Sequence, residues 1–283
     1  MPDAVGFICH PRVDIGHARL REARERLESR GYRVWTHCAT SDEKPGVLQG
    51  ELDGTKLLVS FGGDGTLLWT AQQAATAHVP LLGVNAGRLG FLTEVQFDNV
   101  AAALDRWAGG DFVLQPRPLL EAQVMGKPQR FFALNDAVVH KGEVLNLIRL
   151  DVTIDDDPAG RFDADGAVVS TPTGSTAYAL SLGGPIVRPD ARVLIFLPLN
   201  PHSLFNRAVV LPHDARVSIR LPEGSGLLSC DGQVSTPLEA GAEVQVALGR
   251  GAVELVRFDQ KRNFFELLRQ KLRWGQPLTD AGA

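Results

Sequence analysis

The stretch LLVSFGGDGTLL, residues 57–68, joins an uninterrupted apolar run to a glycine-rich turn and a second apolar segment. The run from Leu57 to Phe61 has the length and composition of a buried strand, and residues 66–77 suit a helix. Glycine in such a turn lets the backbone take positive φ angles and approach a ligand closely. The stretch therefore predicts a strand, a turn and a helix in succession, which is the repeating unit of a parallel α/β sheet.

The segments on either side of this stretch continue the alternation. Residues 5–9 form a short apolar run, residues 16–30 carry Ala and Leu at helical spacing, and residues 32–36 predict the next strand. Farther along, residues 79–84 predict another buried strand and residues 100–107 another helix. We therefore expect an N-terminal α/β domain with a parallel sheet and helices on both faces.

The pattern changes after about Phe112. Short runs of Val, Ile, Leu and Phe then alternate with Gly, Pro and Asp at roughly ten-residue spacing, which predicts a β-rich second domain. Within it, residues 173–182 suit a short helix, and residues 262–274 predict a C-terminal helix that returns to the first domain. The expected domains are residues 1–115 together with about 256–283, and residues 116–255.

Composition excludes several classes of function. Of the 283 residues, 44% are apolar and 22% charged, as in ordinary soluble globular proteins. The net charge of −4 offers no basic surface for nucleic acid. No signal-like start and no run of 18 apolar residues occurs. We expect a cytoplasmic protein with neither a nucleic-acid nor a membrane partner.

Cysteine and histidine spacing argues against a tightly bound metal. Cys9, Cys38 and Cys230 are far apart, form no C-x-x-C pair, and are interpreted as reduced thiols. The seven histidines form no H-E-x-x-H motif. We therefore predict no zinc site, and expect any metal to be loosely held by oxygen ligands.

The glycine turn has the features of a phosphate site, because backbone N–H groups at a helix start attract anions. Asp64 inside it would repel phosphate unless it binds a cation or accepts a proton from an attacking hydroxyl. The alternative is that Asp64 only caps the helix and the glycines only make a tight turn. The motif is neither a P-loop nor the dinucleotide fingerprint, since no G-K-[ST] follows and position 68 is Leu.

Two later stretches also carry polar side chains beside predicted strands. Asn135 and Asp136 could hold two ribose hydroxyls, although a turn before a strand explains an isolated Asn-Asp dipeptide better. Asp163 and Asp165 flank a tight turn, and the hydroxyl residues of 173–176 suit a polar ligand at a helix start, unless they are ordinary caps. Tyr178 offers a ring for stacking and a hydroxyl for anchoring.

Together these motifs resemble the NAD kinase family. The resemblance rests on GGDGT (62–66), the Asn135–Asp136 pair and DG-x-x-x-STPTGSTAY-x-x-S-x-GGPIV (165–187), with weaker support from GVNAGRLGFLTE (83–94), PHSL (201–204) and DGQ (231–233). GGDGT alone is shared with diacylglycerol and sphingoid lipid kinases. A lipid kinase and a non-catalytic NAD(P) sensor therefore stay open as alternatives.

The resemblance implies a fold and a reaction. The α/β domain would bind the phosphate donor, the β-rich domain would bind NAD, and the ligand would lie between them. The implied reaction is transfer of a phosphoryl group from ATP, or in some members polyphosphate, to the 2′-hydroxyl of the adenosine ribose of NAD, giving NADP. Mg²⁺ or another divalent cation would bridge phosphate oxygens. Such an enzyme is a phosphotransferase with an alcohol acceptor, and a homodimer or homotetramer is expected.

The resemblance also implies residue roles. Asp64 would accept the proton, Gly65 would contact substrate, and the turn would hold the donor phosphates through Gly62, Gly63, Gly65 and Thr66. Asn135 and Asp136 would hold ribose hydroxyls. The further nucleotide contacts would be Asp165, Thr173, Thr176, Ala177, Tyr178 and Ser181, with Asn146, Asp163 and Gln233 matching looser family contacts. Asp136 is Glu in many members, and Asp163 lies where some relatives have a basic residue.

Overall fold

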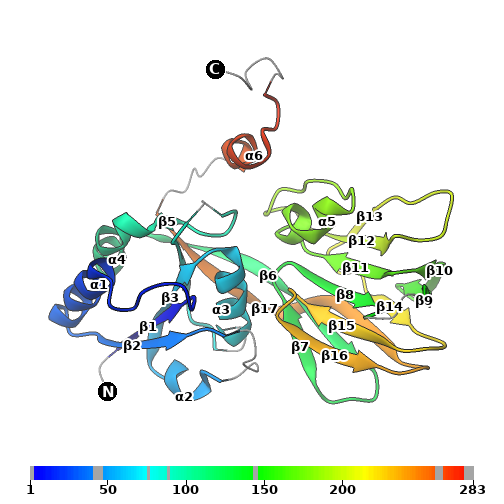
Figure 1. The fold of residues 1–283 in the computed structure, drawn as a ribbon, viewed down its shortest axis with the longest axis horizontal. Coiled ribbons are helices and arrows are strands. Elements are labelled where there is room, and N and C mark those ends of the chain that lie inside the picture. Colours follow the sequence, from blue (N-terminus) through cyan, green and yellow to red (C-terminus); the bar gives the residue numbers. More distant parts are fainter. Residues whose placement is uncertain are drawn as a thin grey trace.

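The computed structural model describes residues 3–40, 47–74, 77–87, 90–142, 146–258 and 264–276. Figure 1 shows an α/β half beside a β-rich half, with helix α6 above the place where they meet. The predicted fold class, an α/β domain followed by a β-rich one and a C-terminal helix, is confirmed.

The α/β half begins with strands and helices that alternate as the sequence predicts. Its elements are β1 (Ala4–Cys9), α1 (Ala18–Ser29), β2 (Arg33–Cys38), α2 (Gln49–Leu52), β3 (Thr55–Gly62), α3 (Asp64–Ala74), β4 (Leu81–Asn85), β5 (Val95–Gln96), the 3-10 turn η1 (Phe97–Asn99) and α4 (Val100–Ala108). Strands β2, β1, β3 and β4 lie in that order and pair in parallel. The carboxyl ends of these strands therefore meet at one edge of the sheet, where α/β proteins bind ligands.

Helices cover both faces of this sheet, because successive side chains of a strand point to opposite faces. Phe7 of β1 packs with Leu20 of α1 and Leu104 of α4 in one apolar cluster. Ile8, the next residue along β1, packs with Leu67 of α3 in another. Helix α3 is thus fixed against the sheet by its own first turn, close to the glycine motif.

The β-rich half contains two sheets that share an apolar core. Its elements are β6 (Val113–Val124), β7 (Arg130–Ala133), β8 (Asp136–His140), β9 (Ile148–Ile154), β10 (Asp157–Ala164), β11 (Gly166–Ser170), the 3-10 turn η2 (Gly174–Thr176), α5 (Tyr178–Ser181), β12 (Val193–Leu199), β13 (Val209–Pro212), β14 (Val217–Arg220), β15 (Gly226–Cys230), β16 (Val234–Leu238) and β17 (Glu243–Arg257). One sheet has the antiparallel order β13-β12-β11-β8-β15-β16.

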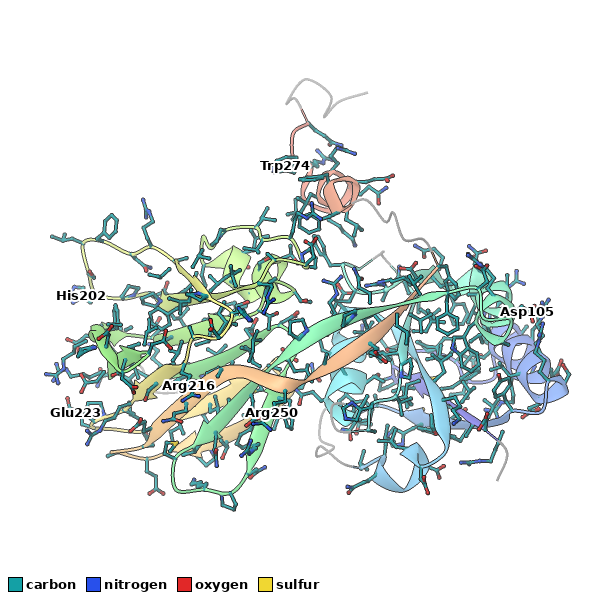
Figure 2. The ribbon with its side chains drawn as sticks, turned by 180° about the vertical axis from the view of Figure 1, so that it is seen from behind. Asp105, His202, Arg216, Glu223, Arg250 and Trp274 are labelled. Carbon is teal, nitrogen blue, oxygen red and sulfur yellow. The ribbon has the colours of Figure 1, made fainter. Side chains whose placement is uncertain are left out.

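The other sheet runs without a break through both halves, in the order β10-β9-β14-β17-β4-β3-β1-β2, with β6 beside β17. Val246 of β17 pairs with Val217 of β14, and Leu255 of the same strand pairs with Leu81 of β4. Figure 2 shows the long strands β6 and β17 crossing from one half to the other. The predicted boundaries near residues 115 and 255 consequently fall inside β6 and β17.

The C-terminal helix is α6 (Phe264–Leu272). Residues 262 and 263 of the helix predicted over 262–274 lie outside the described residues, and so do residues 75 and 76 of the helix predicted over 66–77. Phe264 and Leu267 line the same hollow as Phe91 of the α/β half and Thr173 of the β-rich half. Helix α6 therefore lies over the junction. Among the described residues, no helix is long and apolar enough to cross a membrane.

Candidate active site between the two halves

Asp64 is the first residue of α3 and lies at the carboxyl edge of the parallel sheet. Its Oδ2 accepts a hydrogen bond from the Phe91 N–H at 2.7 Å. Its Oδ1 accepts from the N–H groups of Leu92 at 3.0 Å and Thr93 at 3.4 Å. The carboxylate is therefore held by a neighbouring loop, and the alternative in which Asp64 only caps its own helix does not account for these contacts.

Gly90 is a part of this arrangement that the sequence analysis missed. A Cβ at Gly90 would lie 1.9 Å from Asp64 Oδ1, so any other residue would collide with the carboxylate. Gly90 belongs to the quoted motif GVNAGRLGFLTE, in which Arg88 and Leu89 lie outside the described residues. The sequence carries a signal, because Gly87 and Gly90 flank residues 88 and 89. The residue that Gly90 contacts is Asp64, which lies 26 positions earlier in the chain.

The glycine turn differs from its prediction in one respect. Gly62, Gly63 and Gly65 do not have positive φ angles. The prediction that glycine is needed here for positive φ angles was therefore wrong. Gly62 is required by packing, since its Cβ would lie 2.2 Å from Thr66 Oγ1. Gly63 and Gly65 are exposed, and a Cβ on either would meet nothing within 4 Å. The open backbone of this turn is what a ligand could approach.

The turn borders a hollow of about 440 Å³. Gly63, Gly65 and Thr66 line it together with Gln233, which comes from the β-rich half. The structure thus brings the predicted donor loop next to one of the looser predicted contacts. The Thr66 hydroxyl is buried and has no hydrogen-bond partner among the described residues, and the same is true of Thr173.

A second cavity, of about 570 Å³, brings five of the predicted nucleotide contacts together. Leu68 of α3 forms one wall, one helical turn after Asp64. The predicted residues that line the cavity are Asn135, Asp136, Asp165, Ala177 and Tyr178. Asn135 and Asp136 stand at the start of β8, and Asp165 lies in the turn between β10 and β11.

Burial and charge set the protonation of these groups. Asp136 is 5% exposed, and burial together with the nearby Asp231 carboxylate raises its pKa to about 7. Asp165 behaves oppositely, because a hydrogen bond from Lys141 at 2.7 Å and one from Asn200 lower its pKa. Of these two carboxyl groups, Asp136 therefore exchanges its proton near neutrality and Asp165 stays ionised.

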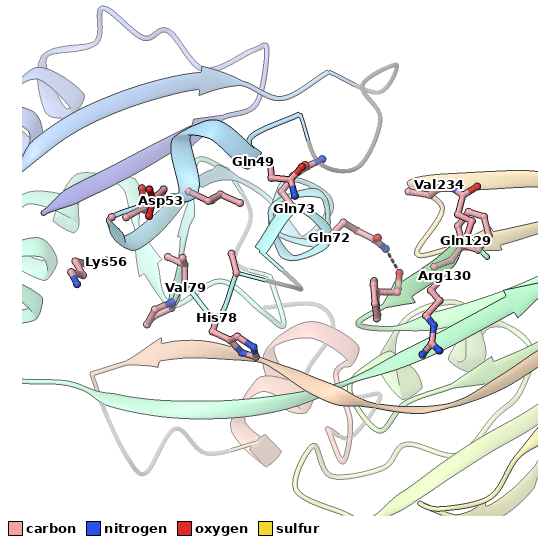
Figure 3. Close-up of a pocket in the computed structure, with 17 residues that line it drawn as sticks. Gln49, Asp53, Lys56, Gln72, Gln73, His78, Val79, Gln129, Arg130 and Val234 are labelled. Carbon is pink, nitrogen blue, oxygen red and sulfur yellow. Dashed lines mark hydrogen bonds between the residues drawn. The ribbon is translucent and has the colours of Figure 1, made fainter. Parts of the chain in front are cut away.

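Other predicted residues lie elsewhere. Thr173 and Thr176 line a hollow of about 240 Å³ with Phe91 and Leu92, the residues that hold Asp64. Asn146, Asp163 and Ser181 are exposed and line none of these three hollows. The Asp163 carboxylate forms an ion pair with Arg149 at 2.8 Å, and that hydrogen bond lowers its pKa. A further hollow of about 840 Å³, shown in Figure 3, contains none of the predicted residues.

Comparison with known proteins decides the family. Residues 5–112 match the family model for the ATP-NAD kinase N-terminal domain, and residues 134–258 match that for the ATP-NAD kinase C-terminal domain. The chain belongs to the NAD kinase family. An NAD kinase from Heliobacterium modesticaldum is 42% identical over 234 residues, which cover 81% of this chain and 82% of the relative. One from Moorella thermoacetica is 39% identical over 263 residues, covering 90% and 84%.

Solved structures of this family have the same fold. Yeast NADH kinase complexed with NADH superposes with a TM-score of 0.81 at 24% identity, covering 98% of this chain and 89% of that one. An NAD kinase from Archaeoglobus fulgidus in complex with ATP gives 0.76 at 24% identity, covering 94% and 98%. Membership in the NAD kinase family removes the lipid kinase alternative.

Proposed function

We propose that this protein is an NAD kinase that transfers a phosphoryl group from ATP or polyphosphate to the 2′-hydroxyl of the adenosine ribose of NAD, giving NADP. One observation carries the proposal: Asp64 and Leu68 lie one turn apart on α3, and Leu68 lines the same cavity as Asn135 and Asp136. The candidate base is therefore on the same helix that forms one wall of the candidate ribose site. Geometry of this kind converts a bimolecular reaction into an oriented one.

Each group of the cavity has a role in this proposal. Asp136 shares a proton near neutral pH, so it can donate to or accept from a ribose hydroxyl. Asp165 stays ionised and is held by Lys141 and Asn200, which suits it to accept hydrogen bonds from the nucleotide. Tyr178 is 41% exposed and offers its ring to a base.

Asp64 would accept the proton of the attacking 2′-hydroxyl. A carboxylate accepts about four hydrogen bonds, and three backbone N–H groups already fix its orientation. One acceptor position is then left for the hydroxyl. Losing a positioned base typically lowers the rate about 10²- to 10⁴-fold.

The donor phosphates would lie at the glycine turn. The first N–H groups of a helix have no partner within it, and they favour anions. Gly63 and Gly65 leave this end of α3 uncovered. No group of three or more His, Cys, Asp or Glu side chains in the described ranges could hold a metal ion. We propose that Mg²⁺ or another divalent cation would be brought by the donor and would offset the negative charge of its phosphates.

The same proposal includes a homo-oligomer. Leu204, Phe205, Val209 and Val210 are exposed apolar residues on and beside β13, an edge strand of the six-stranded sheet. Phe205 is 77% exposed. Exposed apolar edges are surfaces that proteins usually cover, and a second copy with the same edge would cover this one.

The free thiols of Cys9, Cys38 and Cys230 support a reducing, cytoplasmic location.

The deciding experiment incubates the purified protein with NAD, ATP and Mg²⁺ and measures NADP with an NADP-specific dehydrogenase. Parallel reactions with polyphosphate and with NADH identify the donor and the acceptor. Asp64→Asn should keep NAD affinity and lose at least about 10²-fold in kcat. An unchanged kcat would remove Asp64 from its role, and tight NAD binding without turnover from any donor would favour a sensor instead.

A further inference from the structure

We propose that Asp231 is a positioning residue of this site. Its carboxylate fixes the turn that carries Asn135 and Asp136, and joins that turn to helix α3, which begins with Asp64. The inference rests on the proposed function of the Asn135–Asp136 pair. Asp231 belongs to the DGQ motif, to which the sequence analysis assigned a role only at Gln233.

The carboxylate of Asp231 binds three consecutive backbone N–H groups. Oδ1 accepts from Asn135 at 2.7 Å and from Asp136 at 3.1 Å, and Oδ2 accepts from Leu134 at 2.7 Å. The Asp231 N–H in turn donates to the carbonyl of Asp136 at 2.9 Å. Asp231 reaches this position at the end of β15 with a φ of 53°, in the left-handed region that Asp tolerates better than most residues.

The carbonyls of the same turn are bound from the other side. The Thr171 hydroxyl donates to the Leu134 carbonyl at 2.6 Å, and the Thr171 N–H donates to the Asn135 carbonyl at 2.9 Å. Thr171 therefore satisfies the acceptors of this turn and Asp231 satisfies its donors. A side chain with two acceptor oxygens is required, because asparagine would present an NH₂ group to at least one of the three N–H groups.

A second set of contacts joins Asp231 to α3. The amide Nε2 of Gln72 lies 3.4 Å from Asp231 Oδ2 and also donates to the Phe132 carbonyl. Figure 3 shows Gln72 reaching from α3 toward the strands of the β-rich half, with this second bond drawn dashed. Gln72 and Asp64 are on the same helix, about 12 Å apart along its axis. A displacement of Asp231 would therefore change the distance between the ribose site and the base.

The charge of Asp231 affects the pKa of Asp136, which an uncharged side chain in the same place would not do. Its carboxylate lies close enough to Asp136 to raise the pKa of that buried group. Burial raises the pKa of Asp231 as well, while the N–H groups of the turn act in the opposite direction. The other titratable or charged groups around Asp136 are His140, Lys141, Asp165, Tyr178 and Cys230.

The test compares wild type with Asp231→Asn, Gln72→Leu and the control Asp214→Asn, whose carboxylate is 77% exposed. Calorimetry gives the Kd for NAD between pH 5.5 and 8.5, and initial rates give kcat and KM. Asp231→Asn should weaken NAD binding about ten- to hundredfold, since at least one buried N–H loses its partner. It should also move the midpoint of the pH dependence of binding to lower pH, which a purely structural role would not do.

Gln72→Leu removes the amide by which α3 contacts Asp231 and the Phe132 carbonyl, and it leaves the hydrogen bonds between Asp231 and the turn in place. It should lower kcat about two- to tenfold at an unchanged Kd for NAD, while Asp214→Asn should behave as wild type. A folded Asp231→Asn protein with the wild-type Kd and pH midpoint would overturn the inference. If Asp231→Asn fails to fold, Gln72→Leu decides, and wild-type kinetics in that variant overturn it. Absence of NADP formation by wild type would instead refute the proposed function.

Discussion

Replacing Gly90 by alanine should displace the candidate base without touching the nucleotide cavity. An added Cβ would lie 1.9 Å from Asp64 Oδ1 and 2.5 Å from Cγ, whereas real Cβ atoms essentially never approach closer than 3.0 Å. The carboxylate and the loop must therefore separate by about 1 Å. Gly90 does not line the cavity that contains Asn135 and Asp136, so that cavity should keep its shape.

The rate should respond more strongly than binding. A misplacement of about 1 Å at a reacting group costs roughly 10²-fold in rate. Gly90→Ala should thus lower kcat about 10²-fold and leave the KM for NAD within a fewfold of wild type. Overpacking of this kind typically destabilises a protein by about 1–3 kcal/mol, which leaves the domain folded at 25 °C.

NADP formation measured at saturating ATP gives both constants, and the thermal transition checks the fold. Gly87→Ala is the matched control, because it lies in the same loop and its Cβ would meet nothing within 4 Å. The control should retain wild-type kcat. A folded Gly90→Ala enzyme with the kcat of wild type would refute the reasoning that this loop holds Asp64 for the reaction.

Three further variants test other contacts. Gly174→Ala would place a Cβ 2.2 Å from the Asn135 carbonyl, so the KM for NAD should rise at least about tenfold, and an unchanged KM in initial-rate measurements would contradict this. The raised folded-state pKa of Asp136 stabilises the protein fully below about pH 4, and that stability is lost as pH rises through about 7. Urea titrations should therefore show wild type losing up to about 4 kcal/mol over this range relative to Asp136→Asn, and parallel curves would disprove it. Arg257→Met would remove the guanidinium that lies 2.9 Å from the Glu94 carboxylate, a side chain that is 7% exposed, and should cost about 3–5 kcal/mol. Adding Glu94→Gln should recover part of this loss, and an undiminished denaturation midpoint in Arg257→Met would count against the pairing.

The local pattern predicted most of the fold. Apolar runs such as residues 57–61 identified the parallel strands, because a strand buried on both faces has a continuous apolar run and no alternation of apolar and polar residues. The continuity of the large sheet was not predictable in this way. Strand β6 contains Pro116 and Pro118, which suggest that the strand ends there. Both prolines are tolerated because β7 pairs only with residues 120–123 of β6, so that the β7 side of β6 is an edge at residues 116 and 118. Its long partner β17 lies more than 100 residues away.

The candidate site was predictable where a motif is contiguous. Asn135, Asp136, Asp165 and Tyr178, which the resemblance named, line one cavity, and their nucleotide-binding roles stay predictions. The supporting residues were not predictable, because their roles depend on contacts between distant segments. Asp231 binds N–H groups 95 to 97 positions earlier, and no local pattern distinguishes such an aspartate from one in an ordinary turn.

Strand β17 also constrains the order of events during synthesis. Leu81 of β4 leaves the ribosome about 170 residues before Leu255, with which it pairs. At about 5–20 residues per second, that strand edge stays without its partner for roughly 10–35 s. The nascent chain therefore carries an incomplete sheet throughout this interval, and the sheet is completed only after β17 has been synthesised. Chaperones that bind unpaired strands have their longest opportunity here.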